Sequence, residues 1–133
     1  MGTIWIVDDD VEMLGAVQLM LQVLRHDVRG FSEARLAAQA LLAGQSPELM
    51  LLDINMPEVT GLDLLEFVRR RPEWSHMPIV MLSTEAADVT VDKALTLGAD
   101  GYITKPVTVE ELERAVASAL EKRKKGVMQD GKR

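Results

Sequence analysis

The sequence predicts an α/β domain built on a parallel sheet, and three observations support this prediction. Short apolar segments alternate five times with segments of helical periodicity. The connections between them are short, and right-handed crossovers then give parallel strands covered by helices on both faces. Polar residues follow four of the five apolar segments, at the edge where open α/β sheets bind their ligands.

The predicted strands are short and apolar, except the second, whose polar residues are typical of an edge strand. The third is an unbroken apolar run of the kind that is buried on both faces, and it leads directly into Asp53. In chain order the predicted strands are Gly2–Val7, His26–Phe31, Leu49–Leu52, Pro78–Leu82 and Gly101–Thr104.

Five helices are predicted from apolar residues spaced three and four positions apart. Ser32, Thr60 and Thr108 are the expected N-caps, and Gly44 and Gly98 the expected helix ends. The residues expected on buried helix faces are Leu14, Val17, Leu21, Leu24, Leu36, Ala40, Leu41, Leu112, Ala115, Val116, Ala119 and Leu120.

The third predicted helix has a clear end, and the fourth has a weakly helical sequence. The third should run from Gly61 to about Arg71, because Pro72 stops it. The fourth, Ala86–Leu97, contains β-branched residues that lower its helix propensity, so it is expected to be the least rigid.

Composition limits the class of protein. A chain of 133 residues with 47% hydrophobic and 27% charged residues is typical of one soluble domain. It has no cysteine and no run of about 20 apolar residues, which excludes disulfides, cysteine-bound zinc and a membrane span. Its start lacks a signal-peptide pattern, so a cytoplasmic location without membrane contact is expected.

Charge is distributed unevenly along the chain. Residues 122–133 carry six of the 15 basic side chains and one of the 21 acids, so residues 1–121 are strongly acidic. An acidic domain repels nucleic acid, so no direct nucleic-acid binding is expected. The basic residues suit the C-terminal end of a helix, although a phosphate-binding arm is an alternative.

The strand ends bring together residues that suit phosphate and metal chemistry. Asp8 and Asp9 follow the first strand, Asp53 the third, Ser83 the fourth and Lys105 the fifth. Three carboxylates in one place repel one another and need a cation, and an all-oxygen site selects Mg²⁺ rather than zinc. Taken singly, each residue also fits an ordinary cap or loop role.

The two histidines are expected to lie apart from this site. His26 and His76 have no second ligand at metal-binding spacing, so both are interpreted as surface residues.

These residues, with their neighbours, resemble the receiver domain of two-component response regulators. The resemblance covers residues 3 to about 122. The motifs that carry it are Asp8-Asp9, Asp53, Asn55-Met56-Pro57 with Gly61, Pro78 with Met81-Leu82-Ser83, and Gly98-Ala99-Asp100-Gly101-Tyr102 with Thr104-Lys105-Pro106.

The resemblance implies a fold and a domain plan. The fold would be flavodoxin-like and doubly wound, with five parallel strands in the order 2-1-3-4-5 and five helices. Residues 1–122 would form the receiver domain, and residues 123–133 a basic tail or the start of a linker.

The resemblance also implies a role for each site residue. Asp53 would accept a phosphoryl group from a histidine kinase or a histidine phosphotransfer protein, as in a phosphorelay. Mg²⁺ would be held by Asp9, Asp53 and the Asn55 backbone carbonyl, with Asp8 acting through water. Lys105, joined to Pro106 by a cis peptide bond, would pair with a phosphoryl oxygen.

Signal output would use a second set of residues. Ser83 would move toward the phosphoryl group and Tyr102 would turn inward, which alters the face made by the fourth helix, the fifth strand and the fifth helix. A downstream protein, an effector domain or a second copy would bind there. Such a chain is a switch, not an enzyme, apart from catalysing its own phosphotransfer and slow autodephosphorylation.

Two positions depart from the commonest family pattern. Thr84 is larger than the usual alanine or glycine, so it is interpreted as a gatekeeper that restricts access to Asp53. Gly101 stands where regulators with winged-helix DNA-binding domains usually have aspartate, so the dimer of that subfamily is not assumed.

Two other functions compete with the switch. A phosphatase of the haloacid dehalogenase type also uses an aspartate nucleophile and Mg²⁺, but it needs a second acid two residues on. Here that residue is Asn55, whose amide cannot shuttle a proton at neutral pH. A degenerate receiver that only binds a partner is disfavoured by the presence of Asp9, Asp53 and Lys105.

Overall fold

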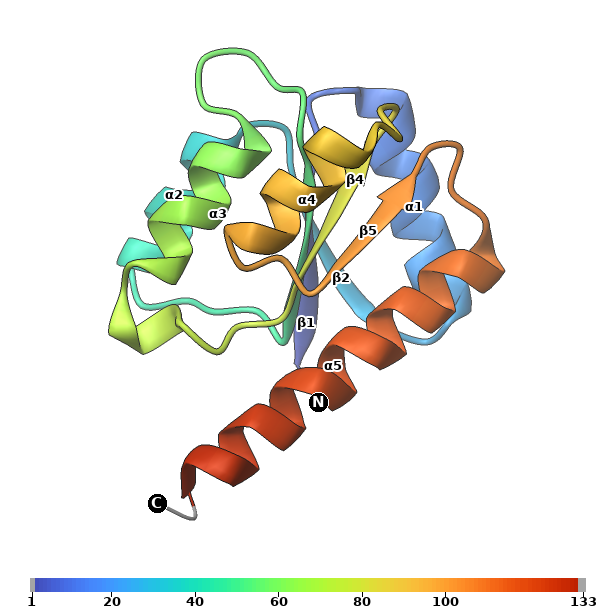
Figure 1. Ribbon diagram of the computed structural model, residues 1–133. Helices are drawn as coiled ribbons and strands as arrows, with labels where there is room; N and C mark the ends of the chain where they lie inside the picture. Colours follow the sequence, from blue (N-terminus) through green and yellow to red (C-terminus); the bar gives the residue numbers. More distant parts are fainter. Residues whose placement is uncertain (1, 132–133) are drawn as a thin grey trace.

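Five parallel strands form one sheet at the centre of the molecule (Figure 1). The structure is a computed structural model that describes residues 2–131, and the side chains of residues 2–124. The strands are β1 Thr3–Val7, β2 Asp27–Phe31, β3 Leu49–Asp53, β4 Ile79–Ser83 and β5 Gly101–Thr104. Their order, β2-β1-β3-β4-β5, confirms the predicted fold class and places the polar second strand at an edge.

Five α-helices cover the sheet, α1 and α5 on one face and α2, α3 and α4 on the other (Figure 1). They are α1 Val11–Val23, α2 Ala34–Leu42, α3 Gly61–Arg69, α4 Asp88–Thr96 and α5 Val109–Gly131, with a short 3₁₀ helix, η1, at Pro72–Trp74. The third helix ends two residues before the expected Arg71, because η1 begins directly afterwards with Pro72 in its first turn.

The core consists of two apolar layers, one on each side of the sheet. All five residues of β3 and all five of β4 are buried, so these strands contribute side chains to both layers. Burying one large aliphatic side chain stabilises a fold by about 1.5–3 kcal/mol. The central strands therefore form a rigid support for the residues that follow them.

Most of the expected helix caps are present. Thr60 and Asp63 form a complete capping box at α3, and the Glu111 amide donates to Thr108 Oγ1 at α5. Gly44 and Gly98 have positive φ angles of 93° and 110°, as residues that end helices often do.

The second helix differs from its prediction in two respects. Its N-cap is Glu33, not Ser32, and it makes no side-chain capping bond. Leu36 is 39% exposed, because the buried face of this helix is made by Ala34, Ala37, Ala40 and Leu41. Leu36 therefore lies outside the buried face of the helix.

A cluster of buried charges lies at one end of the sheet. The strand ends that carry the acids lie at the other end. The Asp100 side chain is fully buried and accepts hydrogen bonds from Arg69 Nη2 at 3.1 Å and from the Ile79 amide at 2.9 Å. Arg123 Nε lies 2.7 Å from Asp100 Oδ1, paired by charge rather than by an aligned hydrogen bond. Both guanidinium groups also donate to the Gly98 carbonyl.

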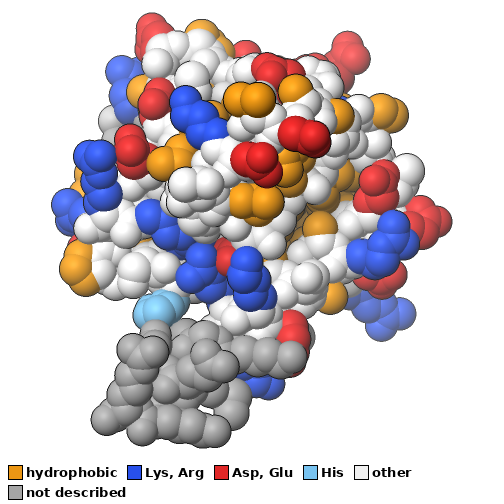
Figure 2. Space-filling view, in the orientation of Figure 1, with side chains coloured by type: hydrophobic (Ala, Val, Ile, Leu, Met, Phe, Trp, Pro, Cys, Tyr) orange, Lys and Arg blue, Asp and Glu red, His pale blue; other side chains and the backbone are white. Residues whose placement is uncertain are grey.

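This cluster joins α3, the start of β5 and the later part of α5. Figure 2 shows basic side chains gathered where α5 leaves the body. Burial, and next the neighbouring charge of Arg123, lowers the pKa of Arg69 to about 10, while Asp100 opposes this change. The domain limit at residue 122 stays a prediction, although Arg123 contacts the body and α5 continues to Gly131.

None of the helices within the described residues is long and apolar enough to cross a lipid bilayer.

Replacing Arg69 with methionine tests the cluster. Arg69→Met should lower the free energy of unfolding by about 3 kcal/mol, because it removes a partner from a buried carboxylate. The control is Arg70→Met, which removes only an exposed pair with Glu66 and should change stability by about 0.5 kcal/mol or less. Urea unfolding measures both, and equal losses would contradict a special role for Arg69.

Candidate functional site

The sheet places the polar strand ends side by side. Asp8 follows β1, Asp53 and Ser83 end β3 and β4, and Lys105 follows β5. Parallel pairing aligns these ends, since Asp53 lies opposite Leu82, and Ser83 opposite Thr104. The four predicted strand ends therefore meet at one edge of the sheet.

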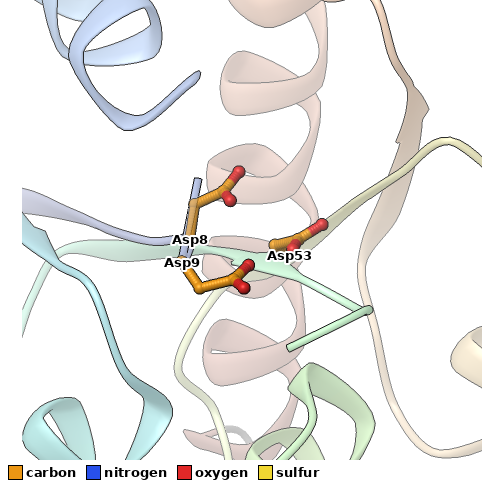
Figure 3. Close-up of side chains that lie close together, drawn as sticks. All are labelled: Asp8, Asp9 and Asp53. Carbon is orange, nitrogen blue, oxygen red and sulfur yellow. The ribbon is translucent and has the colours of Figure 1, made fainter. Parts of the chain in front are cut away.

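Three carboxylates gather at this edge. One oxygen from each of Asp8, Asp9 and Asp53 lies within 4.8 Å of the other two. Figure 3 shows the three side chains pointing toward a common space from two neighbouring strand ends. Asp8 and Asp53 are buried, whereas Asp9 is exposed, so the cluster has one side open to solvent.

Lys105 supplies a positive charge to two of the three acids. Its Nζ donates hydrogen bonds to Asp8 Oδ2 and to Asp53 Oδ1, both at 3.0 Å. Burial would lower the pKa of Lys105, but the bonds to Asp53 and Asp8 outweigh it and the pKa is raised. The lysine is thus held in its charged form between the buried carboxylates.

The charged form of Asp53 remains electrostatically disfavoured in spite of this partner. Burial raises its pKa above the usual value of 3.8, and the nearby charges of Asp8 and Asp9 raise it further. The hydrogen bond and charge of Lys105 lower it, but only in part. A further cation would relieve the remaining repulsion.

The donor set fits Mg²⁺. Three carboxylates offer hard oxygen ligands, and one open side leaves room for water or a phosphoryl oxygen. Within the described residues this is the one cluster of its kind, and it contains neither His26 nor His76. The Asn55 backbone carbonyl lies in the loop that follows β3, and its role as a ligand stays a prediction.

Gly61 fixes the loop that carries Asp53. A Cβ atom at this position would lie 2.1 Å from the Asp53 carbonyl oxygen, so only glycine lets α3 start this close to β3. The Gly61 amide donates to the Ile54 carbonyl at 3.1 Å, and the Ile54 amide donates to Leu82 at 3.0 Å. The short loop is thus tied to both neighbouring elements.

Ser83 and Tyr102 are connected through one residue that sequence reasoning missed. The fully buried Ser83 hydroxyl accepts a hydrogen bond from the Glu85 amide at 3.0 Å. The Tyr102 hydroxyl donates to the Glu85 carbonyl at 2.8 Å, and Thr90 donates to the Glu85 carboxylate. Backbone groups make two of these bonds, so the residue type at position 85 gave no signal for them.

Two further predictions concern this edge. The peptide bond between Lys105 and Pro106 is cis, as the resemblance implied. Thr84 is exposed next to Ser83, and its role as a gatekeeper stays a prediction.

Comparisons with known proteins agree with this geometry. The model of the response regulator receiver domain family matches residues 4–117. The chemotaxis protein CheY homolog of Campylobacter jejuni is 34% identical over 116 residues, which cover 86% of this chain and 89% of that protein. Protein RcaC of Microchaete diplosiphon is 29% identical over 119 residues, which are 90% of this chain but 18% of that protein.

A solved structure shows the same architecture. Chemotaxis protein CheY4 of Vibrio cholerae has a TM-score of 0.81 and 28% identity, over 90% of this chain and 98% of that one. The chain therefore spans nearly all of some relatives and less than a fifth of another. The family model, the relatives and the shared fold together establish that this chain belongs to the response regulator receiver domain family.

Proposed function

We propose that this receiver domain is a phosphorylation-controlled switch that accepts a phosphoryl group on Asp53. The donor is the phosphohistidine of a histidine kinase or of a histidine phosphotransfer protein. The observation that carries this proposal is the buried Asp53 carboxylate, which lies beside two further acids and 3.0 Å from Lys105 Nζ.

The proposed reaction exchanges one bond to phosphorus for another. A carboxylate oxygen of Asp53 attacks the phosphorus atom, the bond from phosphorus to the donor imidazole breaks, and an acyl phosphate forms. The imidazole nitrogen keeps the electron pair of the broken bond and takes a proton from water. Lys105 pairs with one phosphoryl oxygen, and the Ser83 hydroxyl donates to another.

Asp8, Asp9, Asp53 and the Asn55 carbonyl are the proposed ligands of Mg²⁺, with Asp8 acting through water. When bound, the ion supplies positive charge that stabilises the phosphoryl oxygens in the transition state. Lys105 is already paired with Asp8 and Asp53, so its ammonium group is in position beside the attacking carboxylate.

The proposed output runs from Ser83 to Tyr102. If the Ser83 hydroxyl moves toward the phosphoryl group, its bond with the Glu85 amide is lost or rearranged, and Tyr102 is bonded to the same residue. The face made by α4, β5 and α5 then changes. Val89 and Leu95 on α4 are exposed hydrophobic side chains, which supports partner binding there. Figure 2 shows hydrophobic side chains at the surface on this side of the molecule.

The proposed switch has two kinds of partner. One is a phosphodonor protein, and the other is a downstream protein, effector domain or second copy that binds the α4-β5-α5 face. Its catalysis is limited to its own phosphotransfer and slow autodephosphorylation, with Thr84 limiting access, and its location is the cytoplasm.

Replacing Asp53 tests the phosphoacceptor. Asp53→Asn should abolish labelling by acetyl phosphate in Mg²⁺, because an amide keeps the volume of the carboxylate but is not a nucleophile. Intact mass spectrometry measures the added phosphoryl group. The control is Asp10→Asn, which removes a nearby charge but keeps a good N-cap and should still be labelled. Full labelling of Asp53→Asn would remove Asp53 from this role.

Magnesium should stabilise the fold. Millimolar Mg²⁺ is expected to raise the melting temperature, because an ion that binds only the folded cluster stabilises it by mass action. The rise should vanish in Asp9→Ala and persist in Asp92→Ala, an exposed acid of α4. It should also shrink as the pH falls toward the raised pKa of Asp53, since a proton then competes with the cation.

Thermal denaturation with and without the ion, at several pH values, measures this effect. A melting temperature that does not respond to Mg²⁺ in the wild-type chain would count against the metal site.

Amide hydrogen exchange tests the output. Beryllofluoride with Mg²⁺, which mimics the phosphoryl group on Asp53, should change protection between Ser83 and Leu120. The physical reason is that Ser83, Glu85 and Tyr102 share hydrogen bonds. Asp53→Asn is the control and should show no change. Changes confined to the Asp53 loop would mean that another surface carries the signal.

A further inference from the structure

The fifth helix continues past the body of the domain. Its apolar face packs on the sheet through Leu112, Val116 and Ala119, which are buried, and through Leu120, which is partly buried. The next four residues, 121–124, are all charged, yet the helix continues to Gly131 and projects beyond the sheet (Figure 1). Apolar packing on the sheet therefore ends at Leu120, and the direction of the helix beyond it depends on other contacts.

Arg123 supplies contacts of this kind. It lies four residues after Ala119, on the helix face that meets the sheet, and its side chain is only 23% exposed. Its Nε lies 2.7 Å from Asp100 Oδ1, its Nη1 donates to the Ser75 carbonyl at 3.4 Å, and its Nη2 donates to the Gly98 carbonyl at 3.2 Å. We call Arg123 with these three partners the Arg123 clasp.

The Arg123 clasp joins α5 to three separate segments of the chain. Ser75 follows η1, Gly98 follows α4 and Asp100 precedes β5. The neighbouring Lys122 is 62% exposed, and its Nζ approaches Asp100 Oδ1 only to 4.0 Å. Arg123 is therefore placed to set the direction in which α5 leaves the body.

The Arg123 clasp is held less firmly than the rest of the Asp100 cluster. Asp100 is already paired with Arg69, which is 12% exposed, and with the Ile79 amide. Arg123 is the second guanidinium on the same carboxylate, its Nε makes no aligned hydrogen bond, and its bond to the Ser75 carbonyl is long. The two guanidinium groups also repel each other, since burial and then the charge of Arg123 lower the pKa of Arg69. Arg123 can therefore move away without leaving a buried carboxylate unpaired.

Gly98 links the Arg123 clasp to α4. Its carbonyl follows the end of this helix and accepts from Arg69 Nε at 2.9 Å as well as from Arg123. The rest of α4 is lightly held, because Ala94 is its one buried residue and its N-cap, Ala87, makes no side-chain capping bond. A displacement of α4 therefore changes the position of a carbonyl to which Arg123 is bonded.

We propose that Arg123 is a positioning residue that couples α4 to the projecting part of α5. While α4 keeps the position described above, the closed clasp holds α5 in one direction. When α4 is displaced, the clasp opens and α5 beyond Leu120 becomes free to change direction. The cause of the displacement rests on the proposed function, whereas the attachment of α5 by Arg123 does not. The signal then reaches the C-terminal end of the chain without a partner on the α4-β5-α5 face.

Distances between two spin labels test the attachment of α5. Because the chain has no cysteine, Leu42→Cys on α2 and Lys124→Cys on α5, both exposed positions, can carry the labels. Pulsed electron paramagnetic resonance should give a narrow distribution of distances, and Arg123→Gln should broaden it about twofold. The control is Arg114→Gln, an exposed arginine of α5 outside the clasp, which should leave the distribution narrow. Equal widths in the three chains would overturn the proposal.

A second variant separates geometry from charge. Arg123→Lys keeps the positive charge but lacks the planar fork that donates to two carbonyls, so the distribution should stay broad. A narrow distribution in Arg123→Lys would overturn the link through the carbonyls. Both variants should remain folded, because Asp100 keeps Arg69 and the Ile79 amide as partners, and circular dichroism checks this.

Amide hydrogen exchange tests the connection to α4 without phosphorylation. The Gly98 and Ala99 amides donate to the Leu95 and Ala94 carbonyls at the end of this helix. They should exchange several-fold faster in Arg123→Gln than in the wild-type chain or in Arg114→Gln. Unchanged exchange of these two amides would overturn the coupling of α5 to α4.

Beryllofluoride with Mg²⁺ tests whether the coupling serves the switch. In the wild-type chain it should broaden or shift the label distances, and in Arg123→Gln it should cause no further change. Hydrogen exchange of α4 is measured on the same samples. If α4 responds and the label distances do not, the coupling is overturned and the proposed output stands. If neither responds in the wild-type chain, the proposed output is overturned together with the coupling.

Discussion

The ion pairs between Lys105 and two buried carboxylates hold the site together. Each bond is 3.0 Å long, and together they place one positive charge among three negative ones. Removing charges from water is costly unless they are paired, and burial, followed by the charges of Asp8 and Asp9, raises the pKa of Asp53 in spite of Lys105. The folded site therefore keeps an excess of negative charge. A bound cation, or a chemical modification of Asp53, would reduce the repulsion among the carboxylates.

The sheet makes such an arrangement tolerable. Asp8 and Asp9 follow β1 and Asp53 ends β3, two paired strands with almost entirely buried residues, so the packed core opposes separation of the acids. Gly61 adds a second restraint, since α3 begins in contact with the Asp53 carbonyl. The apolar core and the close start of α3 thus keep the three carboxylates near one another.

The sequence predicted much of this arrangement because its signals are local. Apolar runs located the strands, and the capping residues Thr60 and Thr108 located two helices. The convergence of Asp8, Asp53, Ser83 and Lys105 followed from parallel strands meeting at one edge, while the strand order rested on family resemblance.

Other features depend on contacts between distant residues. The Ser32 cap was wrong, since α2 begins one residue later with Glu33 as its N-cap. The buried position of Leu36 was also wrong, since Ala34, Ala37, Ala40 and Leu41 form the buried face, a choice that depends on which side of the helix meets the sheet. The contacts of Glu85 involve backbone groups, and the joining of Arg69 and Arg123 at Asp100 depends on tertiary structure, so residue type could not reveal either.

The Asp100 cluster holds the beginning of β5, where Asp100 binds Arg69 and the Ile79 amide. From there the strand pairs with β4 over its whole length, and the Lys105 amide donates to the Ser83 carbonyl at its end. The backbone of β5 is therefore held from both ends of the sheet. A change at the Asp53 edge has to reach the protein surface through side chains such as Tyr102, whose hydroxyl bonds to the Glu85 carbonyl.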